Sequence, residues 1–197
     1  MALDQLLREA EVSEVSLQVV MFDGEETLYN NTMFGPDGLY GSKYMAGEWS
    51  KALYSPSPGP WCQEGEATLL QRMDLLLLLD LIGAPQPSFQ PYTDPASQEC
   101  DQYAVELSRL EDVLLGTSGD KKFFREECSS ENHNMDDHTP FLEAGLRRAL
   151  HVISDPFPEV WHTLEDNLDN LDYDSINRIN RIIRIFVAEY LNLTPAK

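Results

Sequence analysis

The stretch Met73-Asp74-Leu75-Leu76-Leu77-Leu78-Leu79-Asp80-Leu81-Ile82-Gly83-Ala84 decides the fold class. Its leucine run is bounded by Asp74 and Asp80, so it is too short to cross a membrane as a helix. A short apolar run that stops at charges and then at a glycine is typical of a β-strand buried on both faces of a sheet. We therefore predict a strand over residues 73–82.

Upstream of this strand, the spacing of apolar residues alternates between that of helices and that of strands. Helical spacing relates Leu3, Leu6, Leu7 and Ala10. Residues 15–22 are rich in β-formers and predict a buried strand, and residues 40–53 predict a helix after a glycine-rich turn.

Downstream, the same alternation continues. An amphipathic helix carries Tyr103, Leu107, Leu110 and Leu114 and ends near Gly116. Residues 117–137 look mostly irregular, Thr139-Pro140 begins a helix that stops at Gly145, and residues 149–153 predict a third strand. The last helix shows one apolar face, made of Ile176, Ile179, Ile183, Phe186, Val187 and Tyr190. Strands that alternate with helices predict an α/β fold with a mostly parallel sheet, in which ligands sit beyond the carboxyl ends of the strands.

Length and charge limit the function. At 197 residues the chain is long enough for a single domain with a hydrophobic core, and it has no apolar stretch of membrane-spanning length. With 34 acidic and 14 basic residues its net charge is -20, which repels phosphate backbones and argues against nucleic acid as a partner. Arg178, Arg181 and Arg184 are spaced for one side of a helix, where a solvated or salt-bridged face is commoner than an anion site.

The cysteines and the targeting signals say little about the function or the location of the protein. Cys62, Cys100 and Cys128 are widely separated and include no CxxC pair, so they give no sign of a structural zinc site, and their odd number leaves at least one unpaired. The first residues lack the features of a secretory signal. The sequons that begin at Asn30 and Asn192 would nevertheless matter only in the secretory pathway.

Two distant segments together suggest a metal site. Phe22-Asp23-Gly24-Glu25-Glu26 ends in adjacent carboxylates, and Asp155-Pro156-Phe157-Pro158-Glu159-Val160-Trp161-His162-Thr163 supplies a histidine. A histidine and a carboxylate are zinc ligands, and a second carboxylate beside them could move protons. On spacing alone, however, loop acids and a surface histidine are the commoner explanation.

Five separated blocks resemble, in order, the glutaminyl cyclase (glutaminyl-peptide cyclotransferase) family, zinc-dependent acyltransferases related to the M28 aminopeptidases. The blocks are Leu17-Gln18-Val19-Val20-Met21-Phe22-Asp23-Gly24-Glu25-Glu26, Leu39-Tyr40-Gly41-Ser42, the leucine-rich stretch quoted first, Asp136-Asp137-His138-Thr139-Pro140-Phe141-Leu142, and residues 151–163. The resemblance implies a three-layer α/β sandwich with a mostly parallel central sheet. It also implies one such domain over residues 1–197 that lacks the family's N-terminal segment, with a sheet edge and apolar surface exposed as a result.

The resemblance also implies the site residues. Glu26 and His162 match zinc ligands, Glu25 matches the acid that shuttles protons, and Asp80 and Asp136 match hydrogen-bonded acids beside it. Crowded carboxyls share protons, which raises an apparent pKa. Phe157, Trp161 and His151 match residues at the substrate pocket.

Each assignment has a simpler structural alternative. Asp80 could be a strand-end acid, Asp136 a loop or cap residue, Phe157 a brace for its loop and His151 a core histidine. The chain departs from the family's pattern in two places. The family's third zinc ligand is an aspartate in an upstream motif, and Asp4 stands in a different sequence context, so the role is not assigned to it. The family also has an aromatic residue at the pocket rim shortly after the position of Glu26, where only Tyr29 could replace it.

The leading hypothesis is therefore zinc-dependent cyclisation of N-terminal glutamine to pyroglutamate, with release of ammonia. The substrates would be peptides or proteins that begin with glutamine, and the family's location would be the secretory pathway. One alternative is an inactive fragment or paralogue that serves as an interaction module. An M28-type zinc aminopeptidase is a weaker alternative, because it would require a second metal.

Overall fold

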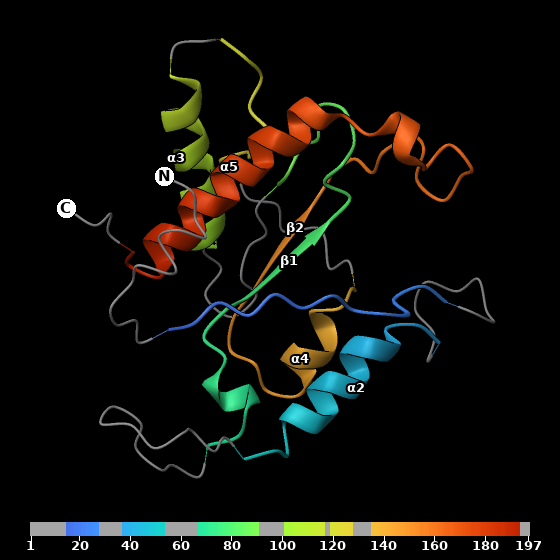
Figure 1. Cartoon of the computed structure of the whole chain (residues 1–197), viewed down its shortest axis with the longest axis vertical. Coiled ribbons are helices and arrows are strands. Elements are labelled where there is room, and N and C mark those ends of the chain that lie inside the picture. The colour runs from blue at the N-terminus through green and yellow to red at the C-terminus, as the bar shows by residue number, and fades with distance from the viewer. Residues whose placement is uncertain are drawn as a thin grey trace. The chain divides into compact units, whose positions relative to one another are not determined.

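The computed structural model of the chain describes residues 15–27, 37–53, 67–90, 101–116, 119–127 and 135–193. Figure 1 shows the elements, which are α2 (Tyr40–Trp49), η1 (Leu70–Arg72), β1 (Leu76–Asp80), α3 (Gln102–Leu115), α4 (Thr139–Glu143), β2 (Ala149–Ile153), η2 (Leu168–Asn170) and α5 (Tyr173–Tyr190). Two of the three predicted strands are present among these residues, together with the helices predicted between and after them. The helical pattern of residues 3–10, the three cysteines, Asn30 and Tyr29 lie outside them.

The strands β1 and β2 are parallel neighbours in a two-stranded sheet. The backbone N–H of Leu76 donates to the carbonyl of Arg148 at 3.2 Å, where the two strands begin. β2 has the predicted bounds, whereas β1 is shorter than the predicted strand over residues 73–82.

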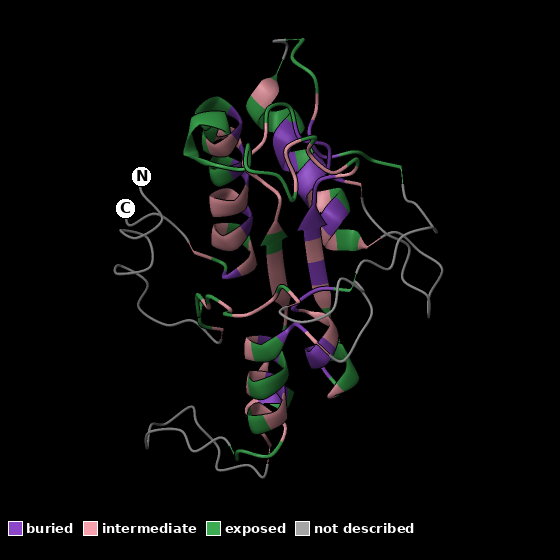
Figure 2. Ribbon diagram, turned by 90° about the vertical axis from the view of Figure 1, so that its right-hand side faces the viewer, coloured by how far each residue is buried: buried purple, intermediate pink, exposed green. Residues whose placement is uncertain are grey.

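The burial predicted for β1 is wrong. Its residues are only partly buried, and Leu79 is 38% exposed, whereas Leu150, Val152 and Ile153 of β2 are buried. Figure 2 shows the difference, because one arrow is mostly purple and the other is pink and green. A strand is buried on both faces only when other elements cover both faces of its sheet. The described part of this sheet consists of two strands.

The prediction of a buried strand over residues 15–22 is also wrong. Residues 16–22 belong to no helix or strand, and Leu17, Val19 and Met21 are 44%, 73% and 87% exposed. A β-rich sequence becomes a strand only when a neighbour exchanges backbone hydrogen bonds with it.

The described residues divide into two compact units. One unit, here called the α2/α4 unit, consists of Val19–Leu78 and His133–His151. The other, here called the α3/α5 unit, consists of Met1–Gln18, Leu79–Asn132 and Val152–Lys197. No helix among the described residues is long and apolar enough to span a bilayer.

Phe141 is the centre of the α2/α4 unit. Its side chain is 1% exposed, and its ring centroid lies 5.7 Å from that of Phe22 and 6.3 Å from that of Trp49. Pro140 in the first turn of α4 fits a helix start, because its missing N–H would have no partner there. The buried core around this ring consists of Ala46, Leu70, Phe141 and Leu146.

Helices α3 and α5 pack against each other in the second unit. The Asp101 side chain caps α3 by accepting from the N–H groups of Tyr103 at 2.8 Å and Ala104 at 3.3 Å. Gly116 follows the helix with φ 55°, a conformation that favours glycine. The helix predicted here and its end near Gly116 are therefore confirmed.

The buried face of α5 differs in part from the predicted one. Ile179 and Phe186 are buried as predicted, but the other fully buried residues are Ser175 and Ile182. The remaining residues of the predicted apolar face are partly buried, namely Ile176, Ile183, Val187 and Tyr190. The face that a helix buries is set by its neighbours as well as by its own period.

Candidate functional site

The loop Asp23-Gly24-Glu25-Glu26 lies against the N-terminus of α2. The backbone N–H groups of Leu39, Tyr40 and Gly41 donate to the carbonyls of residues 25, 24 and 23 at 2.8, 2.9 and 2.9 Å. A Cβ on Gly41 would lie 2.6 Å from the carbonyl oxygen of Asp23, so only glycine permits this approach. The start of α2 therefore fixes the backbone that carries the two predicted site acids.

Glu25 and Glu26 have different environments, as expected for successive residues of a loop. Glu25 is partly buried and Glu26 is exposed. An exposed carboxylate can reach a ligand from solvent, whereas a partly buried one is better shielded from water. This difference is compatible with the predicted division between a proton-shuttling acid and a metal ligand.

A buried polar cluster in the same unit joins two more predicted site residues. His151 Nε2 on β2 lies 2.9 Å from Asp136 Oδ2, and both side chains are less than a tenth exposed. The contact is oblique, since neither atom has a well-directed hydrogen-bond partner among the described residues. The backbone N–H of Asp137 donates to Asp136 Oδ1 at 2.6 Å and completes the surroundings of the carboxylate.

The local backbone also fixes Asp136. Its N–H donates to Thr139 Oγ1 at 3.2 Å, and its carbonyl accepts from the Thr139 N–H at 2.8 Å. This turn leads directly into α4. Asp136 thus has the local role of a turn residue, as the simpler alternative held, and in addition contacts His151.

The pKa of Asp136 is lowered. Burial works against the charged carboxylate, but the contact with His151 and the N–H of Asp137 favour it and hold its pKa below the ordinary value. The prediction that crowded carboxyls raise the pKa is therefore wrong for this residue. Its side chain contacts an imidazole, that of His151.

His138 belongs to this cluster, although sequence reasoning gave it no role. Its ring centroid lies 4.5 Å from that of His151, with the planes inclined by 41°. Its Nδ1 is buried and has no hydrogen-bond partner among the described atoms. Burial, and then the nearby His151, lower the pKa of His138 to about 4. The one signal in the sequence was its position two residues after Asp136.

Asp80 lies in the α3/α5 unit, at the carboxyl end of β1. Its Oδ1 accepts from the N–H of Leu81 at 2.8 Å, and Leu81 has a left-handed φ of 50°. Non-glycine residues rarely adopt this conformation, so the chain turns sharply directly after the strand. Asp80 therefore occupies the strand end at which α/β folds bind ligands.

The loop after β2 carries the remaining predicted site residues. Phe157 and Trp161 make an edge-to-face contact with ring centroids 4.9 Å apart, and the rings of Trp161 and His162 stack at 3.8 Å. Phe157 thus braces its loop, as the simpler alternative held, and also supports Trp161. His162 itself has a positive φ of 58°.

Trp161 lines a pocket of about 260 Å³ in the α3/α5 unit. One wall is the segment 81–84 after β1, and the others come from the loop after β2 and from the approach to α5. The lining includes Pro158, Val160, Asp166, Asn167, Asn170 and Leu171. The lining thus combines an indole ring and apolar side chains with the polar side chains of Asp166, Asn167 and Asn170.

The predicted site residues therefore form two groups. Glu25, Glu26, Asp136 and His151 belong to the α2/α4 unit, and Asp80, Phe157, Trp161 and His162 belong to the α3/α5 unit. The two predicted zinc ligands have suitable donor atoms, a carboxylate oxygen and an imidazole nitrogen. In the described ranges, however, no three His, Cys, Asp or Glu side chains are grouped to hold a metal.

Known proteins resemble this chain over most of its length. The glutaminyl-peptide cyclotransferase of Bos taurus is 40% identical over 91% of this chain, which corresponds to 48% of that protein. A second relative of the same name, from Drosophila melanogaster, is 32% identical over 96% of this chain and 51% of its own length. The chain thus spans about half the length of the curated relatives it matches.

Solved structures support the fold. The glutaminyl cyclase of Macrostomum lignano matches 89% of this chain and 54% of its own, with a TM-score of 0.70 and 32% identity. A leucine aminopeptidase precursor from Bacteroides thetaiotaomicron matches 83% and 50%, with a TM-score of 0.54 and 20% identity, which bears on the fold alone. The predicted α/β fold of M28 type is confirmed. The model of Peptidase family M28 matches residues 1–187, and this chain belongs to that family.

Proposed function

We propose that this chain carries most of the active site of a glutaminyl-peptide cyclotransferase. Relatives and a solved structure that bear this activity in their names support the proposal. The observation that carries it furthest is the buried contact of Asp136 with His151, in the unit that also holds Glu25 and Glu26. The substrates would be peptides or proteins with N-terminal glutamine, met in the secretory pathway.

The reaction needs one proton carrier. The α-amine of the glutamine attacks its own side-chain carbonyl carbon, a C–N bond forms, and the bond to the amide nitrogen breaks to release ammonia. Glu25 takes a proton from the attacking amine and returns it to the leaving nitrogen, so atoms and charge balance. Its partial burial suits this role, because a shielded carboxyl exchanges protons less freely with water.

Asp136 and Asp80 would support Glu25. Because the pKa of Asp136 is lowered, this carboxylate would stay charged, with the N–H of Asp137 and the nearby His151 beside it. Asp80 would accept a hydrogen bond from the substrate amine at the carboxyl end of β1. Trp161, supported by Phe157, would enclose the glutamine side chain in the pocket.

Glu26 and His162 would hold a zinc ion, together with a donor beyond the described residues. When bound, zinc would polarise the amide carbonyl as a Lewis acid. Both side chains have the donor types that zinc prefers. The positive φ of His162 would set the direction of its side chain. The hydrogen bonds from the start of α2 to the carbonyls of residues 23–25 would set the direction of the Glu26 side chain.

Mass spectrometry of a glutamine-initiated peptide tests the proposal. The peptide is incubated with the purified chain and zinc, and enzyme-dependent loss of ammonia is compared with the spontaneous rate. We expect loss that a chelator abolishes, that Glu25→Gln removes, and that Glu48→Gln on the exposed side of α2 leaves unchanged. No loss from folded protein would refute the proposal for this chain and favour the interaction module.

A further inference from the structure

A buried ion pair joins α3 to α5 in the α3/α5 unit. Glu111 is 0% exposed, and its Oε1 accepts a very short hydrogen bond from Arg178 Nη2, although the two residues are 67 positions apart. A fully buried carboxylate is costly unless its oxygens are paired and hydrogen-bonded. This carboxylate is paired and also accepts bonds from the backbone.

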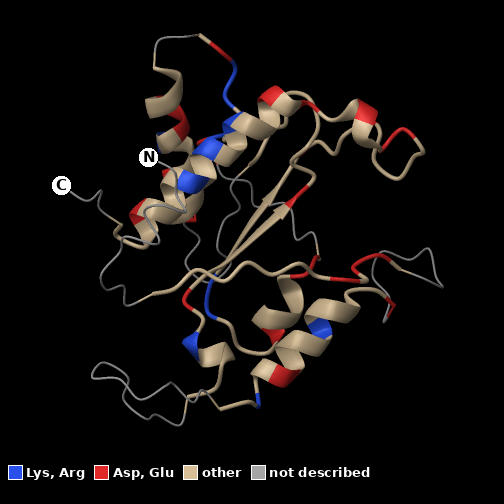
Figure 3. Ribbon diagram, in the orientation of Figure 1, with Lys and Arg blue, Asp and Glu red and all other residues tan. Residues whose placement is uncertain are grey.

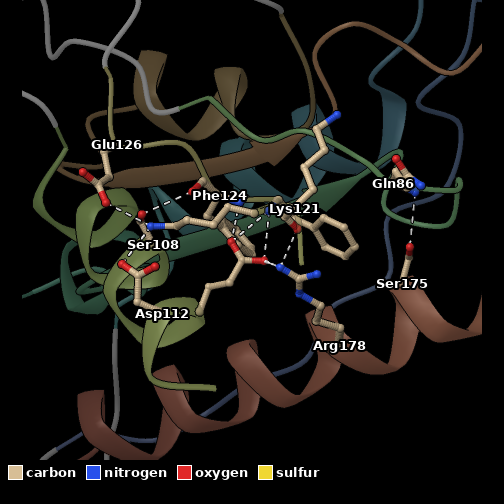
Figure 4. A network of polar contacts seen from close by, with 11 residues as sticks. Gln86, Ser108, Asp112, Lys121, Phe124, Glu126, Ser175 and Arg178 are labelled. Carbon is tan, nitrogen blue, oxygen red and sulfur yellow. Dashed lines mark hydrogen bonds and ion pairs between the residues drawn. The ribbon is translucent and has the colours of Figure 1, made fainter. Parts of the chain in front are cut away.

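The backbone partners of Glu111 belong to residues 123–124. The N–H of Phe123 lies 2.9 Å from both carboxylate oxygens, and the N–H of Phe124 donates to Oε2 at 2.8 Å. Ser108, one turn earlier on α3, donates from its hydroxyl to the carbonyl of Phe124 at 3.2 Å. Figure 4 shows these contacts converging on this short segment.

Arg178, which lies on α5, contacts the same segment. Its Nη2 donates to the carbonyl of Lys121 at 2.8 Å, and its guanidinium carbon lies 3.9 Å from the centre of the Phe123 ring. In Figure 4 Arg178 extends from α5 toward Lys121, and α5 carries the blue arginines of Figure 3. Arg178 is thus the salt-bridged member of the arginine series noted in the sequence.

The segment held by this pair continues to the pocket. The carbonyl of Phe123 accepts from the N–H of Phe89 at 2.7 Å, and the N–H of Arg125 donates to the carbonyl of Phe89 at 2.9 Å. Phe89 also forms an antiparallel bridge with Ser154, and the N–H of Asp155 donates to the carbonyl of Ser88 at 2.7 Å.

Asp155 is the last residue before the loop that carries the pocket wall. Arg125 reaches its carbonyl at 3.4 Å, and the Ser154 hydroxyl donates to the carbonyl of Pro156 at 3.2 Å. Within the loop the backbone hydrogen bonds are local: the Trp161 N–H donates to the Pro158 carbonyl, and the Thr163 N–H donates to the Val160 carbonyl. The position of the loop therefore depends on its attachment at residues 154–155.

We propose that Glu111, with Arg178 as its counter-ion, is a positioning residue for the pocket loop 156–162. The carboxylate anchors residues 123–125, these anchor residues 88–90, and these in turn fix residues 154–155, where the loop begins. The hydrogen bonds of Glu111 described above are made with Phe123, Phe124 and Arg178, none of which lines the pocket. The effect on turnover rests on the proposed function, whereas the effect on the loop does not.

Amide hydrogen exchange measured by NMR tests the relay. Glu111→Gln turns an ionised acceptor into an amide that presents a donor to Arg178 and to the N–H groups of residues 123 and 124. We expect exchange at least about tenfold faster at the amides of residues 89, 123, 124, 155 and 161. The amides of Leu142 and Leu146 in the other unit should stay unchanged. Asp112→Asn, which removes only the exposed ion pair with Lys122, is the matched control.

Arg178→Lys is the second variant, because it keeps the positive charge but loses the planar group over Phe123. It should give the same pattern at smaller amplitude, at least about threefold. Faster exchange that stops at residues 123–125 would overturn the proposal, and so would an equal increase throughout both units. Both results come from the chain alone and do not depend on catalysis.

Kinetics supply the readout that links the relay to the pocket. For a glutamine-initiated peptide, Glu111→Gln should raise KM about tenfold with a smaller fall in kcat, because the pocket wall is displaced while Glu25 is not. Asp112→Asn should leave both constants unchanged. If even the wild-type chain lacks turnover, the proposed function fails and the exchange pattern still decides the relay. An unchanged KM in a variant with selective loop exchange would overturn the link to the pocket.

Discussion

The acid sensitivity of His138 can be worked out from its surroundings. Its ring is partly buried beside His151, and Nδ1 has no hydrogen-bond partner among the described atoms. Burial first, and then the neighbouring imidazole, lower its pKa from 6.5 to about 4. A histidine with a lowered pKa binds protons more tightly when the chain is unfolded. The folded state therefore keeps the full contribution of the neutral ring above pH 6.5 and loses it as pH falls toward about 4.

The size of the effect follows from the two pKa values. Each tenfold change in proton affinity is worth about 1.4 kcal/mol, so a fall of the pKa from 6.5 to about 4 corresponds to about 3.5 kcal/mol. Of this, about 2.5 kcal/mol should disappear between about pH 7 and about pH 4.5. This range lies above the ordinary pKa of aspartate, so the titration of Asp136 contributes little to the difference.

Urea unfolding measures this loss. The free energy of unfolding is determined at about pH 7 and about pH 4.5 for the wild type, His138→Gln and Leu142→Gln. The glutamine at position 138 cannot be protonated, so that variant should lose about 2.5 kcal/mol less than the wild type over this range. Leu142 is 41% exposed on α4, the helix that begins directly after His138, and its replacement should leave the pH dependence of the wild type intact. Equal losses in the wild type and His138→Gln would refute the reasoning.

Three further predictions concern the core, the acid loop and the metal. Phe141→Ala should lower the free energy of unfolding by about 3–5 kcal/mol in a urea titration, because a side chain that is 1% exposed leaves a cavity; a loss below about 1 kcal/mol would contradict the described core. Gly41→Ala should lower the free energy of unfolding by about 2 kcal/mol, because the new methyl group meets the backbone of residue 23. Gly47→Ala on the same helix is the control: its methyl group would enter open space, so this variant should be neutral or slightly stabilising. In zinc titrations and activity assays, Glu25→Gln should keep bound zinc and lose turnover, while His162→Ala should lose both; equal loss of zinc in the two would contradict the assigned roles.

The sequence by itself determined the elements whose signals are local. Gly116 ends α3 because a glycine in the left-handed conformation acts within one turn. Thr139-Pro140 marks the start of α4 in the same local way, and the β-branched and apolar pattern of residues 149–153 gave the bounds of β2. The order of the five blocks was likewise sufficient to indicate the family.

Only the tertiary structure decided the features that depend on distant neighbours. Residues 16–22 have the composition of a strand but form none in the described part of the chain, because a ladder needs a second strand as much as a suitable sequence. The lowered pKa of Asp136 arises from His151, 15 positions further along the chain, and Glu111 is paired with Arg178 across 67 positions. Helical periodicity places Glu111 and Arg178 on their helices but cannot state which helices meet. Burial and electrostatics depend on that meeting, so they follow from the fold and not from the local sequence.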